Sequence, residues 1–315
     1  MELRQLQYLV AVVEEANFTR AAARLHVAQP GVSAQIRQLE RELGQPLLDR
    51  SGRSVTTTEA GEAVLPYARA ALAAIEGVRQ TVDDFTGLLR GRVAVGLVSG
   101  PAGQEFDMVS VVADFHDAHP QVEISLTEDT SERMLAALRR GELDLALAGL
   151  VDEEPPPGLS CQVVIDTPLV AVVAPDDPLG TDRNRAEVPL TELRDRPLIS
   201  LPRGTGLRGV LERVCVEAGF QPRIAFEAAA PHVLTELAAR GLGVAVVPAP
   251  PVGPASLLGE RLRVLTISGP QPRGRIALVW RTDGPAGPAA EALLGRLRTA
   301  LPVPEAADDR ASTTR

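Results

Sequence analysis

Apolar side chains in the first 45 residues recur at the spacing of amphipathic helices. In residues 3–15 they are Leu6, Leu9, Val10 and Val13. Asn17 then stands where a cap would begin a second, alanine-rich helix over residues 18–25. In residues 29–43 they are Val32, Ile36, Leu39 and Leu43, with Gly44 directly after them. The pattern predicts three short helices, and the third has one apolar and one polar edge.

Residues 45–58 break the helical spacing. They hold two short β-prone runs around Ser51-Gly52-Arg53, which predict a β-hairpin, or wing. From Thr58 to Leu89 apolar residues then alternate in steps of four and three: Val64, Ala68, Ala71, Ile75, Val78, Val82, Phe85 and Leu89. Such a seam favours a long helix that pairs with another helix, although a helix packed on its own domain is the alternative. We favour dimerisation because no second apolar face is evident, and we expect Gly91 to end the helix.

Beyond Gly91, short apolar strands alternate with helices. The expected strands are 92–98, 122–128, 143–149, 169–175, 197–200, 223–228, 244–248 and 275–281. The expected helices are one that runs through Phe115, three over 132–140, 207–218 and 233–240, and a last one that ends near Leu301. Strands linked by helical crossovers indicate a mostly parallel α/β sheet. The tail 302–315 lacks periodicity, and we expect it to be disordered.

Charge and cysteine content narrow the function. The chain has 315 residues and a net charge of −9, so it lacks the broad cationic surface that coats nucleic acid, and any DNA contact must be local. Cys161 and Cys215 form no CxxC pair, and no His/Cys cluster has zinc spacing. The acidic start MELRQLQYLV is no signal peptide, and no span of eighteen apolar residues occurs. We therefore expect a cytoplasmic protein without metal or cofactor.

The segment FTRAAARLHVAQPGVSAQIRQLERELGQPLLDRSGRSVTTTEAG resembles the signature of the LysR-type transcriptional regulators. The rest of the chain matches the family in order and length. The resemblance implies an α+β multidomain protein: a winged helix-turn-helix over 1–58, a linker and dimerisation helix over 59–90, and an effector domain over 91–301. Like periplasmic solute-binding proteins, that domain would have subdomain I at 92–164 and 268–301 and subdomain II at 165–267. The implied partners are double-stranded DNA, a small-molecule effector, a second copy in a homodimer or homotetramer, and RNA polymerase.

The third helix is the expected DNA-reading element, because the major groove admits an α-helix. Gln29, Ser33 and Arg37 carry the side chains that bind adenine, guanine or phosphate, and Pro30 opens the helix. Thr19 and Arg20 at the start of the second helix are placed to meet phosphates. Arg53 at the wing tip is placed to enter a minor groove or to contact the DNA backbone. Many family members carry arginine where this chain has Ala34, so one base contact is expected to be absent. These residues could instead be only solvated polar side chains.

The expected effector site lies beyond the carboxyl ends of the strands, where helix N-termini offer free N–H groups. Its candidate residues are Ser99, Gly100, Thr130, Ser131, Leu201, Arg203, Thr205, Phe226 and Glu227. Hydroxyls, helix N-termini and Arg203 together suit a carboxylate or another small anion. Serine and threonine at such positions are also ordinary caps.

Three other interpretations of the sequence carry less weight. RGTGLRG at 203–209 matches the dinucleotide pattern G-x-G-x-x-G, which would indicate an NAD-linked enzyme, but it lies midway through the α/β region rather than at its first strand-helix turn. His116 and His119 have no third metal ligand nearby, and we see no catalytic motif and so expect no enzyme. A solute-binding protein would carry an export signal and would lack the N-terminal helices, so the sequence does not favour that interpretation.

Overall fold

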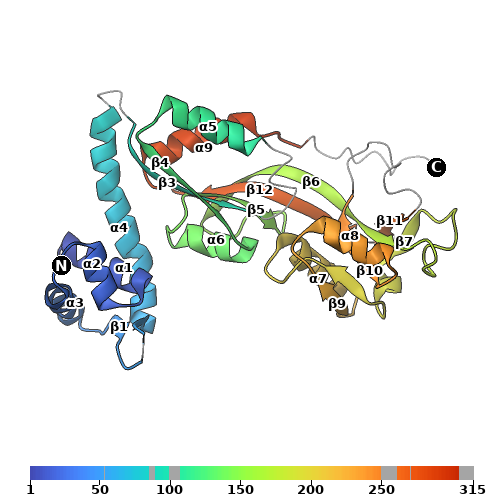
Figure 1. Cartoon of the computed structure of the whole chain (residues 1–315), viewed down its shortest axis with the longest axis horizontal. Helices are drawn as coiled ribbons and strands as arrows, with labels where there is room; N and C mark the ends of the chain where they lie inside the picture. The colour runs from blue at the N-terminus through green and yellow to red at the C-terminus, as the bar shows by residue number, and fades with distance from the viewer. Residues whose placement is uncertain (53, 85–88, 99–106, 250–260, 270, 305–315) are drawn as a thin grey trace.

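The computed structural model describes residues 1–315 except 53, 85–88, 99–106, 250–260, 270 and 305–315. A helical N-terminal unit and one long helix stand beside an elongated α/β part (Figure 1). The mixed helical and α/β architecture expected from the sequence is confirmed. Within the described ranges, no helix has the length and apolar content needed to cross a bilayer.

The N-terminal unit is a three-helix domain with a small hairpin. Its elements are α1 (Leu3–Glu15), α2 (Phe18–Arg24), α3 (Gln29–Leu43), β1 (Leu48–Asp49) and β2 (Thr56–Thr57). Leu9, Val12 and Ile36 are fully buried in its core. The turn between α2 and α3 passes through His26 in a left-handed conformation (φ 54°), and Gly44 (φ 72°) ends α3. The three predicted helices and the wing are thus confirmed.

Helix α4 (Glu59–Asp84) follows the wing and packs first on its own domain. Ala68 is buried in the N-terminal core and Val64 and Ala71 pack against it, so the first part of the predicted seam is covered within the chain. Further along, Ile75 and Val78 are exposed. Gly91 does not end this helix, because the described helix stops at Asp84 and Gly91 begins the next strand; Phe85 lies outside the described residues.

One half of the α/β part is built on strands β3 (Gly91–Leu97), β4 (Val122–Glu128), β5 (Leu145–Leu150) and β12 (Arg273–Arg281). β3 pairs in parallel with β4 and β5, and β12 pairs antiparallel with β5. Helices α5 (Met108–Ala118) and α9 (Pro288–Ala300) cover one face, and α6 (Ser131–Arg139) covers the other (Figure 1). Two apolar clusters fill the spaces between these layers.

The other half has parallel pairs β10–β8 and β8–β9. Its elements are β7 (Glu187–Pro189), the 3-10 helix η2 (Leu190–Leu193), β8 (Leu198–Ser200), α7 (Gly206–Glu217), β9 (Ile224–Glu227), α8 (Pro231–Ala239), β10 (Val244–Pro248) and β11 (Arg263–Ser268). Strands β7 and β11 were not expected from the sequence. β11 pairs antiparallel with β6 and parallel with β7.

A single strand, β6 (Leu159–Val173), joins the two halves into one ten-stranded sheet. It pairs antiparallel with β12 in one half and with β10 and β11 in the other. The expectation of a mostly parallel sheet is therefore wrong at the centre, where the crossover strands run antiparallel. Cys161 lies inside β6.

Candidate DNA-binding surface and effector cleft

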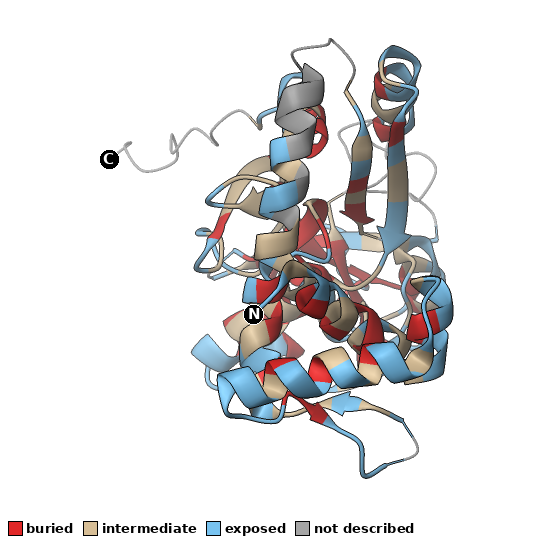
Figure 2. Cartoon of the chain, turned by 90° about the vertical axis from the view of Figure 1, so that its left-hand side faces the viewer, coloured by how far each residue is buried: buried red, intermediate tan, exposed pale blue. Residues whose placement is uncertain are grey.

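The outward side of α3 presents the residues expected to read DNA. Figure 2 looks onto this helix, which lies across the near side of the molecule with exposed positions along it. Its buried positions Val32, Ile36 and Leu39 hold it against the neighbouring helices. Pro30 and Arg37 are exposed, whereas Gln29 and Ser33 are half-buried. The sequence pattern therefore placed Val32, Ile36 and Leu39 on the buried edge correctly, whereas Leu43, also expected there, is exposed.

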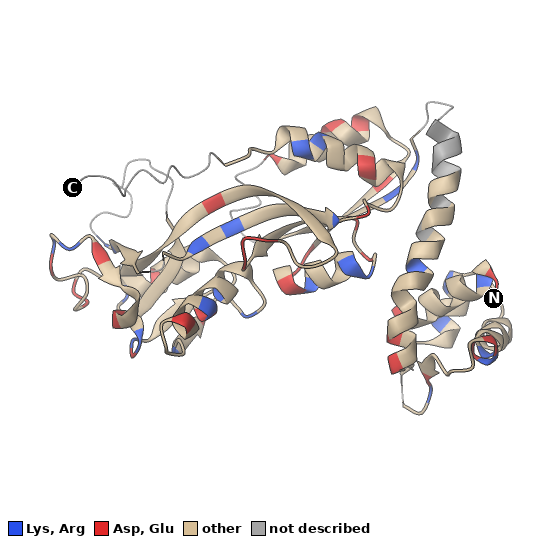
Figure 3. Cartoon of the chain, turned by 180° about the vertical axis from the view of Figure 1, so that it is seen from behind, with Lys and Arg blue, Asp and Glu red and all other residues tan. Residues whose placement is uncertain are grey.

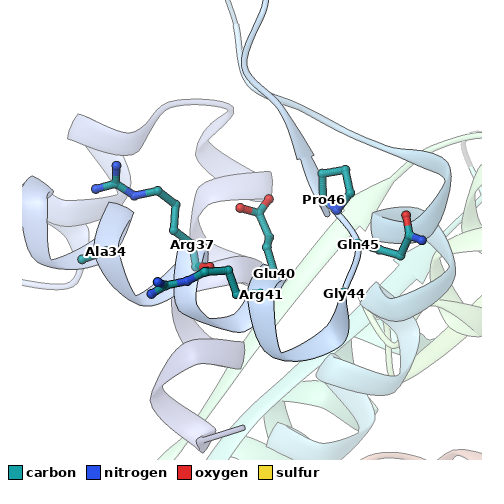
Figure 4. A pocket seen from close by; sticks show the side chains of 7 residues that line it. All are labelled: Ala34, Arg37, Glu40, Arg41, Gly44, Gln45 and Pro46. Carbon is teal, nitrogen blue, oxygen red and sulfur yellow. The ribbon is translucent and has the colours of Figure 1, made fainter.

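An open groove of about 650 Å³ runs between the second half of α3 and the start of the wing (Figure 4). Arg37 and Arg41 line it beside Ala34 and Gly44. The Nε–H of Arg37 donates to the carbonyl of Ser33 (3.2 Å), and that of Arg41 to the carbonyl of Arg37 (3.3 Å). These bonds leave the terminal nitrogens of both guanidinium groups without a carboxylate partner among the described residues.

Glu40 also lines this groove, but its carboxylate is bonded to other groups of the protein. Its carboxylate accepts hydrogen bonds from the backbone N–H groups of Leu47 (3.0 Å) and Leu48 (3.2 Å) and from Arg50 (2.7 Å). The groove therefore offers two free positive groups and a neutralised carboxylate, which suits a phosphate. Sequence reasoning missed Arg41, although its spacing of four residues from Arg37 puts both on one helix edge.

The start of α2 is organised by Asn17. Its side-chain oxygen accepts hydrogen bonds from the N–H groups of Thr19 (2.8 Å) and Arg20 (3.0 Å), so those two donors serve the cap. The Thr19 side chain stays exposed. The Arg20 guanidinium, although exposed, folds back onto the carbonyl of Glu15 and lies 3.5 Å from its carboxylate. Arg53, the expected wing contact, lies outside the described residues.

Basic and acidic residues are interspersed over the N-terminal unit (Figure 3). Arg24, for example, lies 2.7 Å from Glu14 and 3.5 Å from Glu15. Local pairing of this kind leaves no cationic face spread over the described part of the unit. The free arginines of the groove are thus the local positive feature of the α3 surface.

In the α/β part, the two halves meet at the N-terminus of α6. Thr130 caps that helix by accepting from the N–H of Arg133 (3.5 Å). The Ser131 hydroxyl, which is buried, accepts from the backbone N–H of Gly149 (2.9 Å). The N–H of Glu132 donates to the carbonyl of Gly204 (3.0 Å), which belongs to the second half. Thr130 and Ser131 therefore lie at the junction of the halves, next to the Glu132–Gly204 hydrogen bond that crosses it.

The glycines of RGTGLRG bring α7 close to the first half. A Cβ on Gly206 would lie 2.5 Å from the carbonyl carbon of Gly149, and one on Gly209 would lie 2.4 Å from the Val151 side chain. Gly204 has a left-handed φ of 82° and precedes the helix. The pattern that matches a dinucleotide fingerprint thus serves a turn and close packing between the two halves.

An ion cluster that sequence reasoning missed lies beside this junction. Arg208 is 3% exposed, and its guanidinium binds the carboxylates of Glu227 (2.6 Å) and Glu212 (2.8 Å) and the carbonyl of Leu201 (3.4 Å). The structure thereby brings together Leu201 and Glu227, two expected effector residues. The predicted cation Arg203 is instead 83% exposed and lies 3.9 Å from Glu212. Arg208, at the centre of this cluster, lies in an amphipathic helix, and the sequence pattern did not indicate that its side chain is buried.

The remaining candidates are distributed as follows. Thr205 precedes α7, and its hydroxyl donates to the carbonyl of Pro202 (2.7 Å). Phe226 lies on the outer strand β9 with 39% of its surface exposed. Ser99 and Gly100 lie outside the described residues. The structure therefore gathers part of the expected effector set at one junction and leaves Phe226 and Arg203 exposed to solvent.

The two cysteines lie in separate cores. Cys161 packs with the α6 side of the first half, and Cys215 lies on α7 with its side chain buried in the core of the second half. Burial, with the nearby Glu212 charge, raises the pKa of the Cys215 thiol to about 11, and burial also raises the pKa of Cys161. Both thiols are therefore poor nucleophiles at neutral pH. No group of three or more possible metal ligands occurs within the described residues, and the His119 ring contacts Phe115.

Comparison with known proteins decides the family. The sequence model "Bacterial regulatory helix-turn-helix protein, lysR family" matches residues 3–62, and that of the "LysR substrate binding domain" matches residues 86–302. The chain belongs to the LysR family. It is a transcriptional regulator with an effector-binding domain and not an enzyme, so the NAD-linked alternative is wrong.

Individual relatives within the LysR family act in different processes. The chain is 32% identical over 305 residues to the "DNA-binding transcriptional dual regulator OxyR" of Escherichia coli, covering 96% of both chains. It is 30% identical to the "RuBisCO operon transcriptional regulator" of Allochromatium vinosum, covering 93% and 94%. The structure of a full-length OxyR variant from Pseudomonas aeruginosa superposes with a TM-score of 0.68 at 26% identity, covering 95% of both chains. The chain is about equally identical in sequence to regulators that are named for different processes. These comparisons therefore establish the family but do not identify the effector.

Proposed function

We propose that this LysR-family protein binds specific DNA sites through α3 and changes its DNA binding when a small anionic metabolite binds between the two halves of the α/β part. The single observation that carries the DNA interface is the outward edge of α3, where exposed polar residues continue into a groove with two free arginines. In this proposal Gln29 and Ser33 meet base edges, Arg37 meets a guanine or a phosphate, and Pro30 shapes the start of the helix. Thr19, Arg20, Arg53 and Arg41 meet phosphates.

The proposed domain boundaries follow from the same assignment. Residues 1–58 bind DNA, 59–90 link and dimerise, and 91–301 bind the effector, with 92–164 and 268–301 as subdomain I and 165–267 as subdomain II. We propose a homotetramer of the kind known in this family. The exposed Ile75 and Val78 on α4 support a role for that helix between copies. RNA polymerase as a partner and the bacterial cytoplasm as the site of action complete the proposal.

The anionic class of the effector rests on the α7 N-terminus and Arg203. The first turn of a helix attracts negative charge, and Arg203 is a nearby cation that is mostly exposed. Arg208 would contribute less, because Glu212 and Glu227 already neutralise it. We propose Ser99, Gly100, Thr130, Ser131, Leu201, Thr205, Phe226 and Glu227 as the other effector-binding residues.

A response to peroxide is the second candidate function, because several relatives are named hydrogen peroxide-inducible genes activators. A thiol sensor needs an accessible, low-pKa cysteine. Here both cysteine pKa values are raised, and the two residues lie in different cores. This arrangement favours a bound metabolite over thiol oxidation as the signal.

The test is a selection of bound duplexes from a random pool at fixed salt, with and without a panel of small carboxylates and with and without peroxide. Recovery of one enriched motif whose affinity changes with a carboxylate supports the proposal. A protein that enriches no motif contradicts the DNA interface. An affinity change with peroxide that persists in Cys161→Ser/Cys215→Ser would exclude thiol chemistry, and loss of that change in the double variant would favour the second candidate.

A further inference from the structure

Helix α6 reaches from the junction of the two halves to the N-terminal unit. At its start, the N–H of Glu132 donates to the carbonyl of Gly204 in the second half (3.0 Å), and Ser131 is bonded to Gly149. At its end, α6 passes through Arg140 and Gly141 to Glu142. Glu142 contacts Arg69 of α4.

The contact at that end is a shielded ion pair. The Arg69 guanidinium, 9% exposed, lies 2.6 Å from Glu142 and 3.8 Å from Glu14 of α1. Burial alone would raise the pKa of Glu142, but hydrogen bonds from Arg140 and the charge of Arg69 outweigh it and lower that pKa. Arg69 thus links α1, α4 and the end of α6 through the carboxylates of Glu14 and Glu142.

Packing along its length and hydrogen bonds at both ends keep α6 rigid, so a displacement would move it as one body. Met134 and Leu138 are buried against β5 and β12. After the helix, Arg281 on β12 donates to the carbonyls of Leu138 and Leu143 (both 3.3 Å). A tightly packed helix of nine residues transmits a displacement of one end to the other instead of absorbing it.

We propose that α6 couples the junction of the two halves to the DNA-binding unit, with Arg69 and Glu142 as the contact that passes the displacement to α4. An effector that moves the Gly204 loop relative to Gly149 shifts the start of α6. The shift reaches Glu142 and changes how firmly α4 and α1 are held. Arg69 and Glu142 are positioning residues, since neither touches the junction itself.

Energetic coupling between the two ends of α6 is measured by a double-mutant cycle. Gly206→Ala disturbs the junction without any ligand, because the new Cβ would lie 2.5 Å from the Gly149 backbone. Glu142→Gln removes the charge at the other end while keeping its size. Hydrogen exchange of the α4 backbone amides is measured in the intact oligomer for the wild-type protein, both single variants and the double variant.

Gly206→Ala should raise exchange in α4 at least about threefold in the wild-type background and leave it unchanged in Glu142→Gln. Arg133→Gln is the matched control. Arg133 lies on the same helix, but its ion pair within the described residues is with Asp129 (3.5 Å), away from α4. In the Arg133→Gln background, Gly206→Ala should raise exchange in α4 as much as it does in the wild-type protein. An equal increase in both Glu142 backgrounds would overturn the proposal in favour of the α4–α9 contact. No increase in either background would overturn it as well.

A second variant covers the case in which Gly206→Ala does not fold. Thr130→Ala removes the cap of α6 at the same junction and replaces Gly206→Ala in the cycle. The measurement uses neither DNA nor an effector. Its failure would therefore leave the proposed DNA interface standing, and failure of the duplex selection would leave the coupling standing.

Discussion

Replacing Arg41 by alanine tests whether the groove beside α3 holds a DNA phosphate. Arg41 is exposed, and in the described structure its side chain makes one hydrogen bond, from Nε to the carbonyl of Arg37. Its removal should therefore change the free energy of unfolding by less than about 0.5 kcal/mol. Any larger effect on DNA affinity then reports on the contact itself.

The expected magnitude follows from counterion release. Each phosphate neutralised by a cation contributes about −0.9 to the slope of log affinity against log salt concentration. Between about 50 and 200 mM salt, one contact therefore accounts for roughly a 3.5-fold loss of affinity. Arg41→Ala should flatten the slope by about 0.9, and Arg37→Ala/Arg41→Ala by up to about 1.8 if both meet phosphates.

The assay is a titration of a selected duplex and of an unrelated duplex at several salt concentrations. Arg41→Ala should weaken both duplexes by a similar factor, because phosphate contacts carry no sequence information. Arg240→Ala is the control, since it also removes one charge but directly follows α8, paired with Glu236 at 3.1 Å. An Arg41→Ala slope equal to that of wild type would refute the placement of this groove on DNA.

Four further outcomes are expected. Ser33→Ala or Gln29→Ala should relax base preference at one position of the selected site by about 1 to 3 kcal/mol, measured by competition between matched and mismatched duplexes; an unchanged site would mean that another element reads the bases. Cys215 should react with iodoacetamide far more slowly than a free thiol at neutral pH, because its raised pKa of about 11 leaves almost no thiolate, and rapid labelling in the folded protein would contradict its burial. Gly61→Ala should destabilise the N-terminal unit by at least about 2 kcal/mol in denaturant unfolding, because its Cβ would lie 2.0 Å from the Leu47 carbonyl oxygen. Gly295→Ala, where a Cβ meets nothing within 4 Å, should instead stabilise α9 by up to about 1 kcal/mol.

The sequence alone determined the N-terminal unit and the order of its elements. Amphipathic spacing, the Asn17 cap, Pro30 and Gly44 are local signals, and each acts within a few residues of the helix end that it sets. For the same reason, the spacing of apolar residues was enough to assign the polar edge of α3. Most strands and helices of the α/β part were also found, because their apolar runs are short and regular.

Tertiary structure alone decided how distant segments meet. The antiparallel crossover through β6, the pairing of Arg208 with Glu227, and the approach of Gly206 to Gly149 join residues that are not neighbours in sequence. The pairing of Arg69 with Glu142 is of the same kind. Periodicity reports which face of an element is apolar, but not which surface covers it, so the DNA-reading helix was visible in the sequence and the ion pairs and junction were not.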